Sequence, residues 1–313
     1  MRALLIVNPH ATSTTRLRRD VIARALASAV ELEVVETRYR GHGTSLAADA
    51  ASAGYGLVIT LGGDGTVNEA VNGLLRGSRR PAAPALAALP GGSANVFARS
   101  LGLAPDPVDA TGQVLSALTA GRFRSIGLGL ADDRYFTFNS GMGLDAEVVR
   151  AVEGRRAHGR SVSPALYMRM AGRQFWRLTD RRTPAMHLGS PGPDGPDRPG
   201  SPLFWCTISN TSPWTYVGRR PVQTNPEASF DAGLDVFGLG SLGTARTLSV
   251  LRQMLSGRQT GPPRGRGVVT AHNLAMLSLT ADRPVAFQID GEYVGERERV
   301  SFRSVPDALR VVM

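Results

Sequence analysis

The sequence predicts two domains, an α/β domain with a parallel sheet followed by an antiparallel, β-sandwich-like domain. Over the first 124 residues, apolar runs typical of strands alternate with segments of helical periodicity, and this alternation is typical of parallel sheets. Beyond residue 124 the strand-like runs are not regularly separated by helices, which favours an antiparallel arrangement. A chain of 313 residues is also long enough to bury two hydrophobic cores.

The first domain is expected at 1–124, with strands that each precede one or two helices. Its strands are expected at 3–8, 32–37, 57–61 and 85–89, and its helices at 15–29, 43–53, 66–76, 94–100 and 107–120. The second domain is expected at 125–307. Its strands are expected at 126–130, 134–139, 203–209, 234–239, 274–280, 284–290 and 298–303, and a last strand at 308–313 can rejoin the first domain.

Composition narrows the class of protein. There are 36 basic residues against 26 acidic ones, a net charge of +10, and this balance favours polyanionic partners such as nucleic acid, nucleotide phosphates or an anionic membrane. Every basic residue is Arg, which excludes the phosphate-binding lysines of Walker loops and of protein kinases. A single cysteine, Cys206, allows no internal disulfide and suits a reducing compartment. No apolar stretch approaches about 18 residues, so no transmembrane helix is expected.

A glycine turn follows the third predicted strand and is the most informative motif. It runs from Gly62 to Asn68 as Gly-Gly-Asp-Gly-Thr-Val-Asn, and a helix is expected directly after it. Glycine lets the backbone approach a ligand closely, and the N–H groups at a helix N-terminus favour an anion such as phosphate. The spacing fits neither the dinucleotide-binding fingerprint nor the Walker loop. The alternative is a strand-to-helix turn that binds nothing.

Two further turns strengthen the interpretation. Pro90-Gly91-Gly92-Ser93-Ala94-Asn95 follows the fourth strand, and Ser93 is suited to cap the next helix and to donate to a phosphate. Asp290-Gly291-Glu292 brings two carboxylates together, as phosphoryl transfer to an alcohol requires for proton acceptance and for Mg²⁺. An Asp-Gly pair is also common in a plain hairpin turn. Two phosphate-suited turns on neighbouring strands are far more specific than either alone.

Together these motifs resemble the diacylglycerol kinase-like lipid kinases, whose bacterial members and sphingosine kinase relatives share one catalytic domain. The resemblance covers nearly the whole chain. The matching segments are Val7-Asn8-Pro9, Thr37 with Gly41-His42-Gly43, Gly62 to Glu69, Pro90 to Asn95, Asn139-Ser140-Gly141 and Asp290-Gly291-Glu292.

The resemblance implies an NAD kinase/diacylglycerol kinase-like fold, in which an α/β nucleotide-binding domain and a β-rich lipid-substrate domain share a site. It implies an ATP-dependent kinase with Mg²⁺ that phosphorylates a lipid alcohol, with diacylglycerol converted to phosphatidic acid as the leading expectation. Glu292 would be the general base, with Asp290 beside it, and Asp64 would lie by the phosphates and their metal. The nucleotide contacts would be Asn8, Thr37, Gly62, Gly63, Asp64, Gly65, Thr66, Asn68, Glu69, Gly91, Gly92, Ser93 and Asn95.

Two departures from the family pattern bear on these expectations. Bacterial members hold a structural Mg²⁺ with backbone carbonyls and an Asp that matches Asp231, but the Gly that usually follows is Ala232 here. Many bacterial diacylglycerol kinases carry an Asp after the residue that matches Asn95, and this chain has Val96. The missing carboxylate leaves room for a sphingoid base, a glycolipid or another long-chain alcohol as the substrate.

Two other functions compete with a lipid kinase. NAD kinase shares the Gly-Gly-Asp-Gly-Thr turn, but the continuation through Asn68-Glu69 together with Pro90 to Asn95 favours the lipid branch. A non-catalytic nucleic-acid binder would not need Asp290-Gly291-Glu292, and it would be expected to combine Arg with stacking aromatics, which are only 6% here. We therefore expect no nucleic-acid partner.

The last expectations concern location. A helix is expected at 164–182 with Met168, Ala171, Phe175 and Leu178 on one face and Arg169, Arg173, Arg177 and Arg181 on the other. Such a basic amphipathic helix can lie on an anionic membrane, or it can pack on the β domain with its Arg face in water. We expect a cytoplasmic protein in peripheral contact with the inner face of the membrane. The sequence is compatible with a homodimer but does not fix the oligomeric state.

Overall fold

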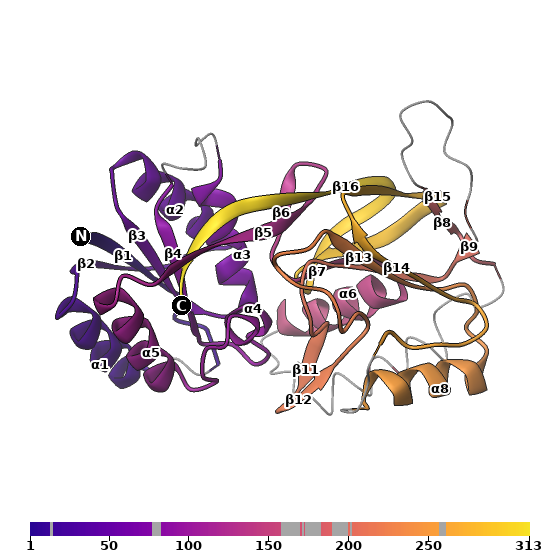
Figure 1. The fold of residues 1–313 in the computed structure, drawn as a ribbon, viewed down its shortest axis with the longest axis horizontal. Helices are drawn as coiled ribbons and strands as arrows, with labels where there is room; N and C mark the ends of the chain where they lie inside the picture. Colours follow the sequence, from indigo (N-terminus) through magenta and orange to yellow (C-terminus); the bar gives the residue numbers. More distant parts are fainter. Residues whose placement is uncertain are drawn as a thin grey trace. The chain divides into compact units, whose positions relative to one another are not determined.

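A computed structural model describes residues 1–12, 15–76, 83–157, 170, 172, 183–189, 200, 202–256 and 261–313 (Figure 1). The chain divides into two compact units, Met1–Leu128 with Pro306–Met313, and Gly129–Val305. The sequence placed the border at residue 124 and let 308–313 rejoin the first domain. The helix expected at 164–182 falls almost entirely outside the described residues.

The first unit is built on a parallel sheet, as the alternation of strands and helices predicted. Its strands lie in the order β2-β1-β3-β4, and Val311 pairs with Leu86 on the far side of β4. Burial of β3 and β4 is complete, as expected for parallel strands covered on both faces. The strands are β1 (Arg2–Val7), β2 (Glu31–Glu36), β3 (Leu57–Gly62) and β4 (Ala85–Pro90).

Helices cover this sheet, and α1 packs against α5 while α2 packs against α3 (Figure 1). Thr15 caps α1 and Asp106 caps α5, each by accepting hydrogen bonds from N–H groups of the first turn. The helices are α1 (Arg16–Ala27), α2 (His42–Ser52), α3 (Asp64–Leu74), α4 (Val96–Ser100) and α5 (Pro107–Thr119). Each begins within a few residues of its predicted position.

The second unit is mainly antiparallel, which confirms the predicted class. Its strands run in the order β14-β13-β10-β7-β15-β16, with β5, β6, β8 and β9 off this path and a separate β11-β12 pair. Their bounds are β5 (Phe123–Ala131), β6 (Arg134–Phe136), β7 (Asn139–Gly143), β8 (Met186–Gly189), β9 (Pro202–Leu203), β10 (Trp205–Ser209), β11 (Thr215–Val217), β12 (Arg220–Val222), β13 (Leu234–Leu239), β14 (Val268–Leu274), β15 (Met276–Ile289) and β16 (Glu292–Val312). β15 and β16 are each one long strand where the sequence predicted separate shorter runs.

Two helices of this unit were not predicted, α6 (Leu144–Ala157) and α8 (Thr244–Met254). α6 begins directly after β7 and was read as part of a strand-rich region. α8 buries Thr247, Val250 and Met254 at helical spacing, a pattern in the sequence that could have predicted this helix. Among the described residues, no helix is long and apolar enough to cross a membrane.

Candidate functional site

The first glycine motif forms the junction between β3 and α3. Gly63 is the N-cap of α3, and no side chain caps the first turn of this helix. A Cβ on Gly62 would come within 2.5 Å of the Thr66 hydroxyl oxygen, so glycine is required where the helix folds back over the strand end. The turn therefore presents a helix N-terminus at the carboxyl edge of a parallel sheet, where anionic ligands bind in this class of fold.

The two glycine turns of this unit are in direct backbone contact. Gly62 pairs with Pro90 in the parallel ladder, and the Gly91 N–H donates to the Gly62 carbonyl oxygen at 2.7 Å. A Cβ added to Gly92 would lie 2.7 Å from the Gly63 Cα, a clash with backbone that no rotamer can relieve. The structure thus brings the two turns together through positions that only glycine can fill.

Hydroxyl and amide groups from the strand ends gather around these turns. The Asn8 side-chain amide, which follows β1, donates to the Thr66 hydroxyl oxygen at 3.3 Å. The Asn8 side-chain oxygen accepts from the His10 N–H at 3.0 Å, which orients the amide. Thr37, which follows β2, donates its N–H to the Val7 carbonyl at 2.8 Å. All four strands therefore contribute a predicted ligand-binding residue near their carboxyl ends.

Asp64 is placed by a contact to the next helix. Its Oδ1 accepts from the Phe97 N–H at 3.1 Å, so one carboxylate oxygen links α3 to α4. The turn before α4 is fixed by Asn95, which accepts from the Gly92 N–H and donates to the Gly92 carbonyl, both at 2.8 Å. Asn95, with φ of 48°, is also the N-cap of α4. Ser93, which was expected to cap this helix, is exposed and lies before that position.

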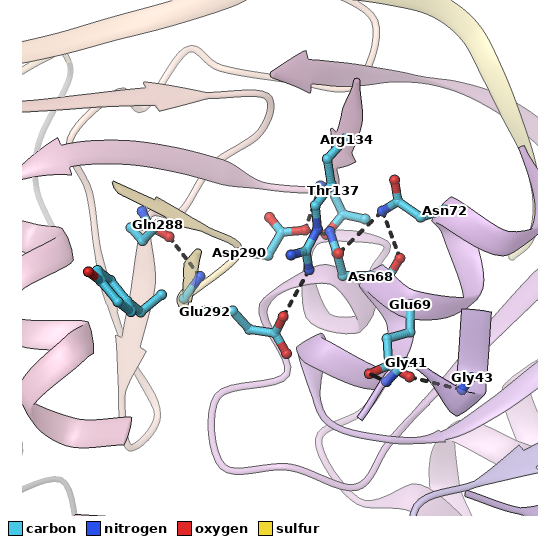
Figure 2. A network of polar contacts seen from close by, with 12 residues as sticks. Gly41, Gly43, Asn68, Glu69, Asn72, Arg134, Thr137, Gln288, Asp290 and Glu292 are labelled. Atoms are coloured by element: carbon cyan, nitrogen blue, oxygen red, sulfur yellow. Dashed lines mark hydrogen bonds and ion pairs between the residues drawn. The ribbon is translucent and has the colours of Figure 1, made fainter. Parts of the chain in front are cut away.

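Glu69 and Asn68 are both held by intramolecular contacts (Figure 2). The Glu69 carboxylate accepts from the N–H groups of Gly41 and Gly43 at 2.7 and 2.9 Å, and so fastens the loop that begins α2. Asn68 is fully buried, and its side-chain oxygen accepts from the Asn72 amide at 3.2 Å. These bonds hold the turn and the start of α2, and the nucleotide contacts expected of Asn68 and Glu69 stay predictions.

In the second unit, the Asp290-Gly291 motif is a two-residue hairpin turn between β15 and β16. Both residues have positive φ, 47° and 75°, which is the type I′ geometry that Asp-Gly favours. Asp290 is buried, and its carboxylate accepts from the Thr137 N–H and hydroxyl at 2.7 and 2.8 Å. The N–H groups of Phe138 and Asn139 donate to its other oxygen at 3.0 and 3.2 Å. With four hydrogen bonds to residues 137–139, Asp290 fixes the hairpin, and the catalytic role expected of it stays a prediction.

Glu292 lies directly after this turn and has a different environment. Its carboxylate pairs with the Arg134 guanidinium at 2.8 Å, and the two side chains are 20% and 30% exposed (Figure 2). Solvent and a ligand can therefore reach Glu292, in contrast to Asp290. The sequence analysis missed Arg134, although its place in the short β5–β6 hairpin is the signal that could have found it.

A buried network of hydrogen bonds, centred on Gln288, supports the hairpin. Gln288 is 1% exposed, and its side-chain oxygen accepts from the Gly291 N–H at 2.8 Å. Its side-chain nitrogen donates to Asn139 Oδ1 at 2.8 Å and to Asp145 Oδ2 at 2.9 Å. Burial raises the pKa of Asp145 to about 7, and the hydrogen bond from Gln288 opposes that rise. Neither Gln288 nor Asp145 was predicted to serve the site.

Helix α6, which carries Asp145, makes two further contacts with β16, the second strand of the hairpin. Glu153 accepts from the Tyr293 N–H at 3.2 Å, and Arg150 pairs with Glu296 at 3.0 Å. Beside α6 opens a pocket of about 100 Å³ whose lining includes Arg150, Met186 and Phe204. That volume is below the roughly 300 Å³ of ordinary ligand pockets, so the pocket alone does not identify a substrate.

The turn proposed for a structural metal is held by side chains. The Gly233 N–H donates to Asn273 Oδ1 at 2.7 Å. Asp235 is buried and accepts from the Asn273 N–H at 2.9 Å, while its other oxygen contacts His272. Among the described residues, no three His, Cys, Asp or Glu side chains cluster as metal ligands, at Asp231 or elsewhere. A site made of one Asp and backbone carbonyls would not contain such a cluster, so the structural Mg²⁺ expected at Asp231 stays a prediction.

Comparison with known proteins agrees with the motifs. Residues 2–130 match the family model of the diacylglycerol kinase catalytic domain. A probable lipid kinase YegS-like of Chromohalobacter salexigens is 35% identical over 147 residues, 47% of this chain and 45% of that protein. A diacylglycerol kinase of Bacillus subtilis is 33% identical over 159 residues, 49% of this chain and 50% of that protein. The matches therefore span about half the length of these relatives.

Solved structures resemble the whole chain. A putative diacylglycerol kinase from Bacillus anthracis superposes with a TM-score of 0.74 and 20% identity, covering 99% of this chain and 96% of that one. A second diacylglycerol kinase structure from that organism gives a TM-score of 0.71 at 18% identity, with the same coverage. At such identities the likeness shows the fold, which is the NAD kinase/diacylglycerol kinase-like fold predicted from the sequence. The family match thus covers residues 2–130, which is less than half of the chain.

Proposed function

We propose that this protein transfers a phosphoryl group from ATP to the hydroxyl of a lipid alcohol, with diacylglycerol as the substrate and phosphatidic acid as the product. The observation that carries the proposal is the backbone contact between the two glycine turns at the N-terminus of α3. The first turn of α3, which no side chain caps, leaves N–H donors beside that contact for a phosphate chain, in a protein whose sequence has no lysine. The family match over residues 2–130 supports ATP as the donor.

In this proposal the glycine turns bind the nucleotide and Asp64 lies by its phosphates. One oxygen of Asp64 accepts from Phe97, which orients the carboxylate. A carboxylate and substrate phosphates are the usual ligands of catalytic Mg²⁺, so the residues present fit a metal that arrives with ATP. Mg²⁺ bound there neutralises charge that develops on the transferred group. The hydroxyl of Thr66 and the amide of Asn8 are close enough to each other to contribute further donors.

Glu292 acts as the general base in this proposal. Its carboxylate accepts the hydroxyl proton of the lipid as that oxygen forms its bond to the γ-phosphorus, and the bond from phosphorus to the bridging oxygen breaks to release ADP. The partly exposed position of Glu292 supports this role, whereas the saturated carboxylate of Asp290 does not. Arg134 holds Glu292 in one orientation until substrate binds.

The substrate class is tested with radiolabelled ATP and a panel of lipid alcohols, with products separated by thin-layer chromatography. The panel includes diacylglycerol, a sphingoid base, a monoacylglycerol and a glycolipid, because Val96 removes the carboxylate that many diacylglycerol kinases have at that position. Labelled phosphatidic acid from diacylglycerol is the expected product. Label on NAD with none on any lipid would replace this proposal with the NAD kinase alternative.

Location and assembly are part of the proposal. A lipid kinase must meet its substrate at a bilayer, so we propose a cytoplasmic protein in peripheral contact with the inner membrane face. Arg169, Arg173 and Arg177, the face first expected to make that contact, lie outside the described residues. A homodimer stays a prediction for light scattering to check.

A further inference from the structure

A continuous stretch of the second unit is basic and wholly without acidic residues. Between Asp235 and Asp282 the sequence contains no Asp or Glu but five arginines. One of them, Arg258, lies outside the described residues. The other four are exposed, and in the part of the chain that the structure describes they form no ion pair with any neighbour: Arg246, Arg252, Arg264 and Arg266.

Helix α8 turns one face of this stretch outward. Val250 and Met254 pack against a core that includes Trp205 and Phe237, so the helix is anchored on the unit through its apolar side. Leu248 and Arg252, four residues apart, lie on the side of α8 away from the buried stripe, and Arg246 is exposed closer to its edge. Leu248 is 57% exposed, an apolar side chain in water next to Arg252.

A second segment, residues 264–267, is held against α8 and the residues before it. Gln253 on α8 donates to the Arg264 carbonyl at 3.0 Å and accepts from the Arg264 N–H at 2.9 Å. The Gly240 N–H donates to the Gly267 carbonyl at 2.7 Å, which closes the segment onto the residues before the helix. The loop arginines are therefore carried on the same scaffold as α8 (Figure 1). We call Arg246, Leu248, Arg252, Arg264 and Arg266 the α8 surface.

We propose that the α8 surface docks the protein onto an anionic lipid bilayer. The inference rests on the proposed function, because a lipid alcohol is presented in a membrane. Each arginine near an anionic leaflet contributes roughly fivefold in affinity, and the stretch that carries these arginines contains no Asp or Glu of its own. The outward Leu248 suits the boundary between headgroups and acyl chains, where amphipathic helices place apolar side chains. A nucleic-acid backbone would offer no comparable partner for that leucine.

The test compares two charge-matched variants in vesicle co-sedimentation. The double substitution Arg246→Gln/Arg252→Gln removes two charges from α8. Its control, Arg16→Gln/Arg24→Gln, removes two exposed charges from α1 in the other unit. With vesicles of phosphatidylcholine and phosphatidylglycerol in equal parts, the α8 variant is expected to bind roughly 30-fold more weakly than wild type and the control to bind nearly as well. Leu248→Ser should weaken the binding that survives at high salt.

The outcomes separate this inference from the proposed function. Turnover of a short-chain, water-dispersed diacylglycerol should be equal in both double variants and in wild type. Equal losses of vesicle binding in the two variants would overturn the α8 surface even if lipid phosphorylation is observed. If no lipid is phosphorylated but vesicle binding still depends on α8, the docking surface stands and the kinase proposal fails. Binding to a DNA duplex that depends on α8, with vesicle binding unchanged, would replace the membrane with nucleic acid.

Discussion

The glycine turns of the first unit and the Asp290-Gly291 hairpin of the second unit, which carry the proposed chemistry, are built in opposite ways. The glycine turns of the first unit depend on missing side chains, because Gly63 and Gly92 touch backbone to backbone. The hairpin of the second unit depends on polar side chains, because Asp290 and Gln288 bind the N–H groups around the turn. The first arrangement leaves backbone donors for a ligand, while the second consumes them and projects one carboxylate, that of Glu292. Binding and proton transfer thus call for different local architectures.

The largest expected effect comes from the carboxylate that the hairpin projects. Glu292→Gln should lower kcat by about 10²–10⁴, because a positioned proton acceptor contributes about that much. ATP affinity measured by calorimetry should be little changed, since the residue lies outside the glycine turns. A collapse of ATP affinity with kcat preserved would make Glu292 a nucleotide or metal contact instead of the base.

Replacing Asp64, the carboxylate of the first unit, should lower kcat somewhat less. Asp64→Asn keeps an oxygen that can accept from the Phe97 N–H, so the fold and melting temperature should be retained. The lost charge beside the phosphates and Mg²⁺ should reduce kcat by about 10²–10³. Circular dichroism checks the fold, and initial rates at saturating ATP and Mg²⁺ check the chemistry. If the variant keeps more than half of the wild-type kcat, Asp64 does not belong to the site.

The backbone contact of the glycine turns is tested by adding one methyl group. Gly92→Ala places a Cβ within 2.7 Å of the Gly63 Cα, and such overpacking costs about 1–3 kcal/mol. The turns must separate, so we expect ATP to bind about tenfold more weakly while the hairpin geometry is unaffected. Gly112→Ala is the matched control, because a Cβ there meets nothing within 4 Å and its φ is ordinary. Similar ATP affinities in both variants would show that contact between the turns is not needed for binding.

The hairpin is tested through its buried support. Gln288→Leu removes the acceptor of the Gly291 N–H and the donor to Asp145, and an unsatisfied buried group costs about 1–3 kcal/mol. Glu292 should be less well positioned, so we expect kcat to fall about tenfold with the KM for ATP unchanged. Gln288→Glu should be worse, since it places a second carboxylate against Asp145. Adding Asp145→Asn to that variant restores a donor and an acceptor, and recovery of activity would distinguish positioning from simple destabilisation.

The sequence predicted the glycine turns well because their geometry depends on the residue types at the turns themselves. Gly62, Gly63 and Gly92 are required by contacts within or between neighbouring strands of the sheet. The hairpin was located for the same reason, since Asp-Gly specifies a type I′ turn. The different environments of Asp290 and Glu292 were not predictable. Asp290 accepts hydrogen bonds from residues 137–139, and Gln288 donates to Asn139 and Asp145, all about 150 residues away in the sequence. Helix α8 was missed even though Thr247, Val250 and Met254 recur at helical spacing, and the Gly/Pro-rich sequence that follows it was the only part of this region singled out.

The smallest expected effect is on stability, and it comes from the acid beneath the hairpin. Burial raises the folded-state pKa of Asp145 to about 7 from its ordinary value of 3.8, so the folded protein holds a proton that the unfolded chain releases between those values. The free energy of unfolding should therefore decrease as the pH rises from about 4 to 7 and then level off, with a slope of at most about 1.4 kcal/mol per pH unit from this group. Asp145→Asn should flatten that slope, because the amide does not titrate. Denaturant unfolding of both proteins at intervals from pH 5 to pH 8 measures the difference. If the two slopes coincide, Asp145 is ionised across this range, and its bond to Gln288 is then a charged one throughout.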